Sequence, residues 1–146
     1  MMTIKVKTFT ELTREELYAI LQLRVAVFVV EQDCPYQDVD GKDQKALHVF
    51  GIKEDKIVAY TRVFEAGDYF EEASIGRVVV AKDQRKYGYG YDIMKASIQA
   101  VEEYFKTKTI HLSAQVYLTK FYNNLGFTEI GEGYLEDDIP HIKMVR

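Results

Sequence analysis

Hydrophobic and polar positions follow two different periods on either side of residue 88. The segment 75–80 is rich in β-branched residues, which is typical of a strand buried on both faces. Beyond residue 90, apolar side chains recur every three or four positions, at Met94, Ile98, Val101 and Phe105, with polar residues on the other side. The pattern predicts a buried strand, a charged turn and an amphipathic helix.

A second helix is expected near the amino terminus. Thr13 and Glu16 have the spacing of a capping box, which marks the start of a helix. The apolar run 25–30 is denser than an amphipathic helix needs, so we expect the far end of this segment to lie beneath other elements. A polar connection follows at 31–43, and connections of this length are often functional.

Strand patterns occupy much of the remaining chain. They fall at residues 4–9, 47–52, 57–64, 74–80, 109–113, 127–134 and 142–145. The second to fourth of these are expected to be adjacent and antiparallel. A short helix is expected at 116–125, which Gly126 can end in the left-handed conformation. The element order is therefore β-α-β-β-β-α-β-α-β-β.

Composition favours an ordinary globular protein. Of 146 residues, 47% are apolar and 29% are charged, which suits one domain spanning 1–146. No stretch approaches the roughly 20 apolar residues of a membrane span and no signal-peptide pattern is present, so we expect a cytoplasmic protein that does not bind membranes. The net charge of −4 argues against a nucleic-acid partner. Cys34 has no cysteine partner, and no spacing predicts a metal site.

The charged turn has the features of an anion-binding loop. Its string is Arg85-x-x-Gly88-x-Gly90, and the two glycines allow a ligand to approach the main chain. The next helix presents unpaired N–H groups and the positive end of its dipole at this point. Lys82 and Lys86 add positive charge beside Arg85. The site is therefore suited to a polyanion.

Spacing separates this loop from two better-known glycine-rich loops. A P-loop requires Lys and then Ser or Thr after the second glycine, where this chain has Tyr91 and Asp92. A dinucleotide-binding fingerprint requires a small residue where Ile93 lies, and an acidic residue at the end of the next strand. Neither pattern is present.

The unit of strand, Arg/Gln-x-x-Gly-x-Gly/Ala loop and helix resembles the pyrophosphate loop of the GNAT superfamily of N-acyltransferases. The string Phe121-Tyr122-x-x-x-Gly126-Phe127 is similar to a second signature of that family, and the element order matches its fold. Strings within 23–40, 75–78 and 135–141 resemble its ElaA-type branch. The resemblance covers nearly the whole chain. It implies an α/β (α+β) class, with a single GNAT-like domain and a central mixed, mostly antiparallel sheet flanked by helices.

The resemblance also implies a reaction. Acetyl-CoA would be the co-substrate, without a metal, and the acceptor would be a primary amine of a small molecule or a peptide. Main-chain groups of the strand would pair with pantetheine and those of the loop with pyrophosphate. The residues expected at the cofactor are Val78, Val79, Val80, Arg85, Lys86, Tyr87, Gly88, Tyr89, Gly90 and Tyr91. The oligomeric state, monomer or homodimer, is left open.

Tyr122 is the expected general acid. A phenol with a pKa of about 10 can protonate a thiolate with a pKa of about 8.5 only in a matched, water-poor setting. The same tyrosine would also suit a place in the core. The role of general acid therefore follows from the family resemblance, and it requires a water-poor environment around the phenol.

No general base stands out. An alkylammonium group, with a pKa of about 10.4, must lose a proton before it attacks. Glu31, His48, Glu72 and Asp138 are suitable residue types for the acceptor side, and each also suits a structural or surface role. Carboxylates concentrate at 31–43 and 129–138, which favours a cationic acceptor, although the same charge would serve solubility.

Two other classes of function remain open. The chain could be a catalytically weak acyl-CoA-binding or regulatory domain. It could also be a nucleotide-binding or interaction module that uses the loop for another polyanion. The complete loop and Tyr122 favour the enzyme.

Overall fold

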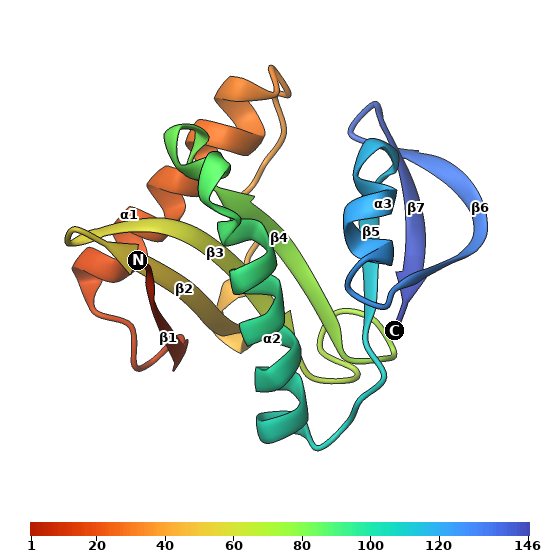
Figure 1. Cartoon of the computed structure of the whole chain (residues 1–146), viewed down its shortest axis with the longest axis horizontal. Helices are drawn as coiled ribbons and strands as arrows, with labels where there is room; N and C mark the ends of the chain where they lie inside the picture. Colours follow the sequence, from red (N-terminus) through yellow and green to blue (C-terminus); the bar gives the residue numbers. More distant parts are fainter.

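The computed structural model describes residues 1–146 and contains one seven-stranded sheet with helices on both faces (Figure 1). The strands are β1 (Thr3–Thr8), β2 (Leu47–Lys53), β3 (Lys56–Phe64), β4 (Ser74–Val80), β5 (His111–Gln115), β6 (Thr128–Glu136) and β7 (Ile139–Val145). Their order is β1-β2-β3-β4-β5-β7-β6. All neighbours are antiparallel except β4 and β5, so the predicted mixed, mostly antiparallel sheet is confirmed.

Helix α1 (Arg14–Arg24) begins as the capping box predicts and continues as a π-helical segment, Val25–Glu31. The Thr13 hydroxyl accepts a hydrogen bond from the Glu16 N–H at 3.0 Å. The expectation that the following apolar run is covered is wrong for Val25 and Val30, which are 38% and 70% exposed. A π-helical turn contains an extra residue, so the run no longer keeps one face on the sheet.

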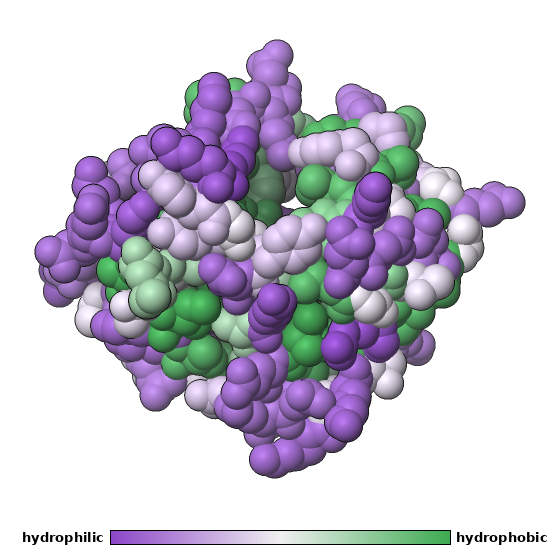
Figure 2. Space-filling model, in the orientation of Figure 1, coloured by the Kyte–Doolittle hydropathy of each residue, from purple (hydrophilic) through white to green (hydrophobic).

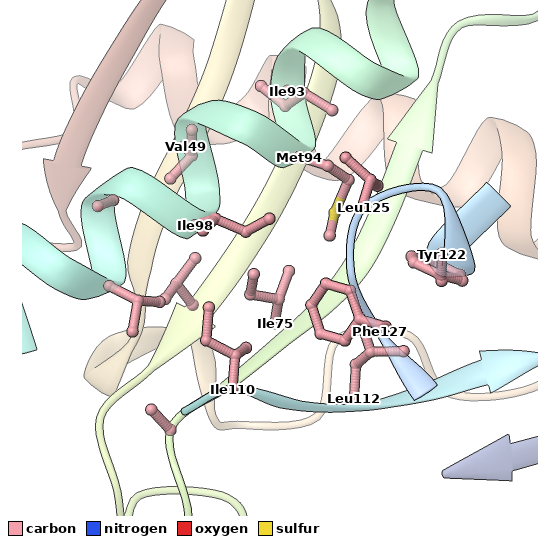
Figure 3. Close-up of a cluster of buried hydrophobic side chains, with 14 of the residues drawn as sticks. Val49, Ile75, Ile93, Met94, Ile98, Ile110, Leu112, Tyr122, Leu125 and Phe127 are labelled. Carbon is pink, nitrogen blue, oxygen red and sulfur yellow. The ribbon is translucent and has the colours of Figure 1, made fainter. Parts of the chain in front are cut away.

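Helices α1 and α2 (Tyr89–Phe105) cover opposite faces of the sheet. Successive strand residues point to opposite faces, and Ala59 packs under α2 whereas Tyr60 packs under α1. Figure 3 shows Ile93, Met94 and Ile98 of α2 in the larger cluster. The smaller cluster, under α1, consists of Ile20, Leu23, Val27, Phe50, Tyr60 and Val79. No helix combines the length and the apolar character needed to cross a bilayer.

The carboxyl-terminal half differs from the sequence prediction in its boundaries. Strand β5 begins at His111 rather than at residue 109, and α3 covers only Thr119–Asn123, after a 3₁₀ turn. Gly126 has a φ of 91°, the left-handed conformation that was predicted. Strands β6 and β7 are longer than predicted, because Asp137 and Asp138 have φ values of 51° and 62° and close a tight hairpin turn.

The connection after α1 is fixed by buried ion pairs. The Arg24 side chain is 1% exposed. Its Nε donates to Asp38 Oδ2 at 2.9 Å, and its Nη1 donates to Asp43 Oδ1 at 2.8 Å. One guanidinium therefore ties the middle of the connection and its end to the helix that precedes it.

Two strand residues complete the same network. Arg62 of β3 donates to Asp40 Oδ2 at 2.7 Å and to Asp43 Oδ1 at 3.0 Å. Arg77 of β4 lies 2.8 Å from the Asp38 carboxylate. Three arginines from three elements thus hold three aspartates of one loop against the sheet.

The network makes stability depend on pH. Burial alone would raise the pKa of the Asp40 and Asp43 carboxyls, but their guanidinium partners hold both pKa values below the usual range. Their contribution to stability is therefore fully present above the ordinary aspartate pKa of about 3.9, and it is lost as the pH falls through the lower folded-state values.

Replacement of Arg24 tests the network. Arg24→Gln leaves two buried carboxylates without their shared partner, so we expect the free energy of unfolding to fall by about 3–5 kcal/mol in urea denaturation. Arg14→Gln, an exposed change in the same helix, should alter it by less than about 0.5 kcal/mol. Equal urea midpoints for the two variants would contradict this role of the network.

Candidate functional site

Strands β4 and β5 meet at one end only. They pair at a single position, Ser74 with His111, and diverge beyond it (Figure 1). The divergence opens a cleft of about 570 Å³, which Figure 2 shows as a hollow with hydrophobic residues in its depth. This volume is in the usual range of small-molecule sites, roughly 300–1,000 Å³.

The β4 wall of the cleft combines a β-bulge with unpaired main chain. Arg77 has a φ of 50°, and together with Val78 it opposes the single residue Thr61 of β3. Beyond Ser74 no strand pairs with the edge of β4 that faces β5. Val78 and Val80 are consequently half-buried, and the prediction of a strand buried on both faces is wrong at these two positions.

The predicted anion loop follows β4 as a 3₁₀ turn, Lys82–Tyr87, and leads into α2. Gly88 has a φ of 74°, which other residues rarely adopt. A Cβ on Gly90 would lie 3.4 Å from the Phe121 ring. The cleft lining includes Val78, Val79, Val80, Arg85, Gly88, Gly90 and Tyr91 but not Lys86, Tyr87 and Tyr89.

Arg85 already has an anionic partner. Its guanidinium donates to both carboxylate oxygens of Glu31, at 2.6 and 2.8 Å, and its Nε donates to the Val80 carbonyl at 3.2 Å. The hydrogen bonds from Arg85 lower the pKa of Glu31. A polyanion that binds this loop must therefore compete with Glu31 for the guanidinium or share it.

Tyr122 reaches the cleft from α3. Its ring meets Phe121 and Phe127 edge-on, and Figure 3 shows it beside Phe127 at the margin of the core. The residue is 5% exposed, yet its hydroxyl has no hydrogen-bond partner and is not sealed off from the cleft. Burial, with a smaller contribution from Tyr117, raises the pKa of the phenol. The phenol therefore keeps its proton at neutral pH, on a residue that lines the cleft.

Of the four residues expected on the acceptor side, Glu31 alone lines the cleft. His48 is enclosed, with its Nδ1 2.6 Å from the Tyr60 hydroxyl and its Nε2 3.0 Å from the Asp43 carbonyl. Burial lowers the pKa of this imidazole, which keeps it neutral. The structure thus places His48 beneath the buried network rather than at the cleft.

The other two expected residues lie just outside the cleft lining. Glu72 is 3.4 Å from His111 Nδ1 and 3.7 Å from Lys143 Nζ. Asp138 lies in the β6–β7 turn, beside Asp137, which does line the cleft. The turn therefore approaches the cleft through the neighbour of the residue that the sequence indicated.

Most of the carboxylates that the sequence concentrates at 31–43 are paired with arginines in the structure. Asp38, Asp40 and Asp43 are paired with buried arginines, and Glu31 is paired with Arg85. Asp33 is left as the unpaired carboxylate of this connection.

Two further residues face the cleft that the sequence analysis did not assign to the site. His141 of β7 is 6% exposed and lines the cleft. The Cys34 thiol donates to the Asp137 carbonyl at 3.5 Å and brings the connection against the β6–β7 turn. The signal for His141 in the sequence was its place at the end of the string 135–141 that resembles the ElaA-type branch, which does not assign a role to the imidazole.

A family model for the acetyltransferase (GNAT) domain matches residues 10–146. The chain belongs to the GNAT acetyltransferase family. It is 44% identical over 139 residues to protein ElaA of Escherichia coli strain K12. The aligned residues make up 94% of this chain and 91% of that protein. These findings confirm the GNAT resemblance and its ElaA-type branch.

Solved structures agree with this GNAT assignment. The crystal structure of Escherichia coli ElaA and that of an acyl-CoA N-acyltransferase from Pseudomonas aeruginosa each have a TM-score of 0.93 and 41% identity. Both matches cover 100% of this chain and 99% of the other. The fold is therefore that of GNAT acyltransferases.

Replacement of Gly88 tests the loop of this GNAT chain. Coenzyme A should raise the melting temperature of the wild type, and Gly88→Val should remove that shift, because valine resists a φ of 74° and narrows the anion site. Gly67→Val is the matched control, because Gly67 also has a positive φ, 91°, and lies outside the cleft lining. Equal shifts for both variants and the wild type would refute the assignment of the loop.

Proposed function

We infer that the protein is an acetyl-CoA-dependent N-acetyltransferase that acts on a primary amine, with Tyr122 as the general acid. One observation carries this conclusion. The unpaired main chain of β4 and the unbonded hydroxyl of Tyr122 face the same cleft. The first suits a ligand that carries amide groups, and the second suits a leaving group that needs a proton.

The shape of the cleft fits acetyl-CoA as substrate. Pantetheine has amides that can extend β4 as an added strand would, at Val78 and Val80. The diphosphate would then lie at the beginning of α2, where Gly88 brings main-chain N–H groups close and the helix dipole is favourable. The order of these groups along β4, the loop and α2 matches their order in the cofactor.

Arg85 would change partners when the cofactor binds. Its pair with Glu31 is partly exposed, with side-chain exposed fractions of 43% and 27%. Such pairs contribute at most about 1 kcal/mol, so a diphosphate with two or more charges can displace the carboxylate. The Glu31 carboxylate would then be free on the edge of the cleft.

The acceptor is proposed to be cationic before reaction. The carboxylates without an arginine partner gather where the connection after α1 meets the β6–β7 turn, at Asp33, Asp137 and Asp138. Burial and then these three carboxylates raise the pKa of the Cys34 thiol, which lines the cleft beside Asp137. An ammonium group would be attracted there and a carboxylate would be repelled.

Tyr122 would protonate the departing thiolate. Attack of the amine nitrogen on the thioester carbonyl gives a tetrahedral intermediate, and its collapse breaks the C–S bond. The sulfur then needs a proton in a place with little water. The phenol retains its proton because burial raises its pKa, and the same surroundings raise the proton affinity of the thiolate.

An amine panel tests the proposed reaction. We expect release of coenzyme A from acetyl-CoA to require an amine, and the best acceptors to be cationic, with rates that fall as salt is added. The assay follows free thiol at several ionic strengths. Binding of acetyl-CoA without turnover for any amine would instead support the acyl-CoA-binding domain, and neutral acceptors with salt-independent rates would refute the charge argument.

Tyr122→Phe tests the general acid. The change keeps the ring, so the melting temperature and acetyl-CoA affinity should stay nearly constant while turnover falls roughly 10²–10⁴-fold. Tyr60→Phe is the matched control for a structural tyrosine, because the Tyr60 hydroxyl is buried and hydrogen-bonded to His48. It should cost about 0.5–1.5 kcal/mol of stability and leave turnover unchanged. Wild-type turnover of Tyr122→Phe at every pH would remove this residue from the mechanism.

A further inference from the structure

The acceptor end of the cleft contains one imidazole with a nitrogen that makes no hydrogen bond to the protein. His141 Nδ1 lies 2.7 Å from the Ile139 carbonyl, and a carbonyl oxygen can only accept, so Nδ1 carries the hydrogen. His141 Nε2 makes no hydrogen bond within the protein and is not sealed from the cleft. In the neutral ring this second nitrogen therefore offers a lone pair to whatever occupies the cleft.

Two neighbouring strands hold this ring in place. Tyr134 of β6 stacks on His141 with ring centroids 6.2 Å apart, and the Tyr134 hydroxyl is hydrogen-bonded to Ser113 of β5. On the other side, His141 is paired in register with Gln115. The side-chain amide of Gln115 donates across the cleft to Gln32 at 3.2 Å. The ring thus has a fixed orientation at the wall of the cleft.

A carboxylate lies close to the second nitrogen of His141. Glu136 Oε2 lies 3.4 Å from Nε2, and Asp137 lines the cleft beside it. The nearby cation, Lys143, lies on the same face of β7 but its Nζ sits over the Phe70 ring and 3.7 Å from Glu72. The Cys34 thiol, whose pKa burial raises, adds no charge beside the cleft at pH 7. A proton taken by Nε2 therefore finds a carboxylate ready to stabilise it.

We propose that His141, supported by Glu136, is the general base that takes a proton from the ammonium group of the acceptor. This inference rests on the proposed acetyl transfer and adds the missing base to it. The site supplies what an ammonium acceptor needs, namely carboxylates that attract it and an unprotonated nitrogen that accepts its proton. No other imidazole lines the cleft.

The proton balance closes with Tyr122. His141 Nε2 takes one ammonium proton, and the freed nitrogen lone pair forms the N–C bond. Collapse of the intermediate breaks the C–S bond, and the Tyr122 phenol protonates the sulfur. The extra proton on the new amide nitrogen restores the phenol, and the imidazolium releases its proton to solvent. The net products are the N-acetyl amine, coenzyme A and one proton.

His141→Asn is tested with two acceptors, the best alkylamine of the panel and an O-alkyl hydroxylamine, whose nitrogen is unprotonated at pH 7. We expect turnover to fall roughly 10²–10⁴-fold with the alkylamine and to stay near the wild-type value with the hydroxylamine. The deficit with the alkylamine should shrink as the pH approaches the ammonium pKa of about 10.4, because the acceptor then loses its proton without help.

His111→Asn is the matched control. Its Nδ1 also lies 3.4 Å from a carboxylate, that of Glu72, but His111 is outside the cleft lining. It should leave both reactions unchanged. Glu136→Gln, at a half-exposed side chain, should move the acidic limb of the pH–rate profile to lower pH, and this variant keeps the test available if His141→Asn fails to fold.

The outcomes separate the two proposals. A wild-type protein without turnover on any amine would overturn the proposed function and this inference together. A wild-type protein with turnover overturns the inference alone if His141→Asn matches it on the alkylamine, or loses activity equally on both acceptors. If His141→Asn is unfolded, an unmoved acidic limb in Glu136→Gln overturns the inference.

Discussion

The site depends on the failure of β4 and β5 to pair beyond one position. They are the one parallel pair in the sheet, and a parallel pair needs a crossover, which α2 provides. The crossover leaves β4 at its carboxyl end, where β4 and β5 are apart. The beginning of α2, with its unpaired N–H groups, therefore lies at the cleft. The same divergence leaves the main chain of Val78 and Val80 without a strand partner on the β5 side. It also allows Tyr122 of α3 to line the opposite side of the cleft. One missing set of ladder hydrogen bonds therefore creates the volume and the binding groups together.

Pairing of charges divides this cleft into two ends. At the β4–α2 end, the positive charge belongs to Arg85, which is paired with Glu31 in a partly exposed ion pair. At the β6–β7 turn, carboxylates remain without arginine partners, because the arginines near them are committed to Asp38, Asp40 and Asp43. The net charge of −4 gives no hint of this separation, which arises from the fold. Under the proposed function, a polyanion and an ammonium group would bind at opposite ends of one cleft without competing for the same residues.

Local patterns allowed much of this structure to be predicted. The capping box of Thr13, the left-handed Gly126 and the strand–loop–helix unit around Gly88 each depend on residues near one another in sequence, so spacing was sufficient. The prediction was wrong at Val25 and Val30, because a change from α- to π-helix alters the period without any local signal. The burial of Asp38 and Asp43 could not be predicted from the sequence, because their partner Arg24 is 14 and 19 residues away. His141 depends on three strands that come together only in the sheet.

The buried arginine–aspartate network has a consequence for how the protein can change over time. Asp43 bridges Arg24 and Arg62, and Asp38 bridges Arg24 and Arg77, so the energetic effects of substitutions in this set are strongly coupled. Removal of one member leaves an unpaired buried charge, whereas replacement of several members together by apolar residues can be nearly neutral. The connection between α1 and β2 is therefore difficult to remodel by single substitutions. Variation in acceptor choice among proteins built this way is expected to accumulate first at the β6–β7 turn, where the carboxylates have no partners to lose.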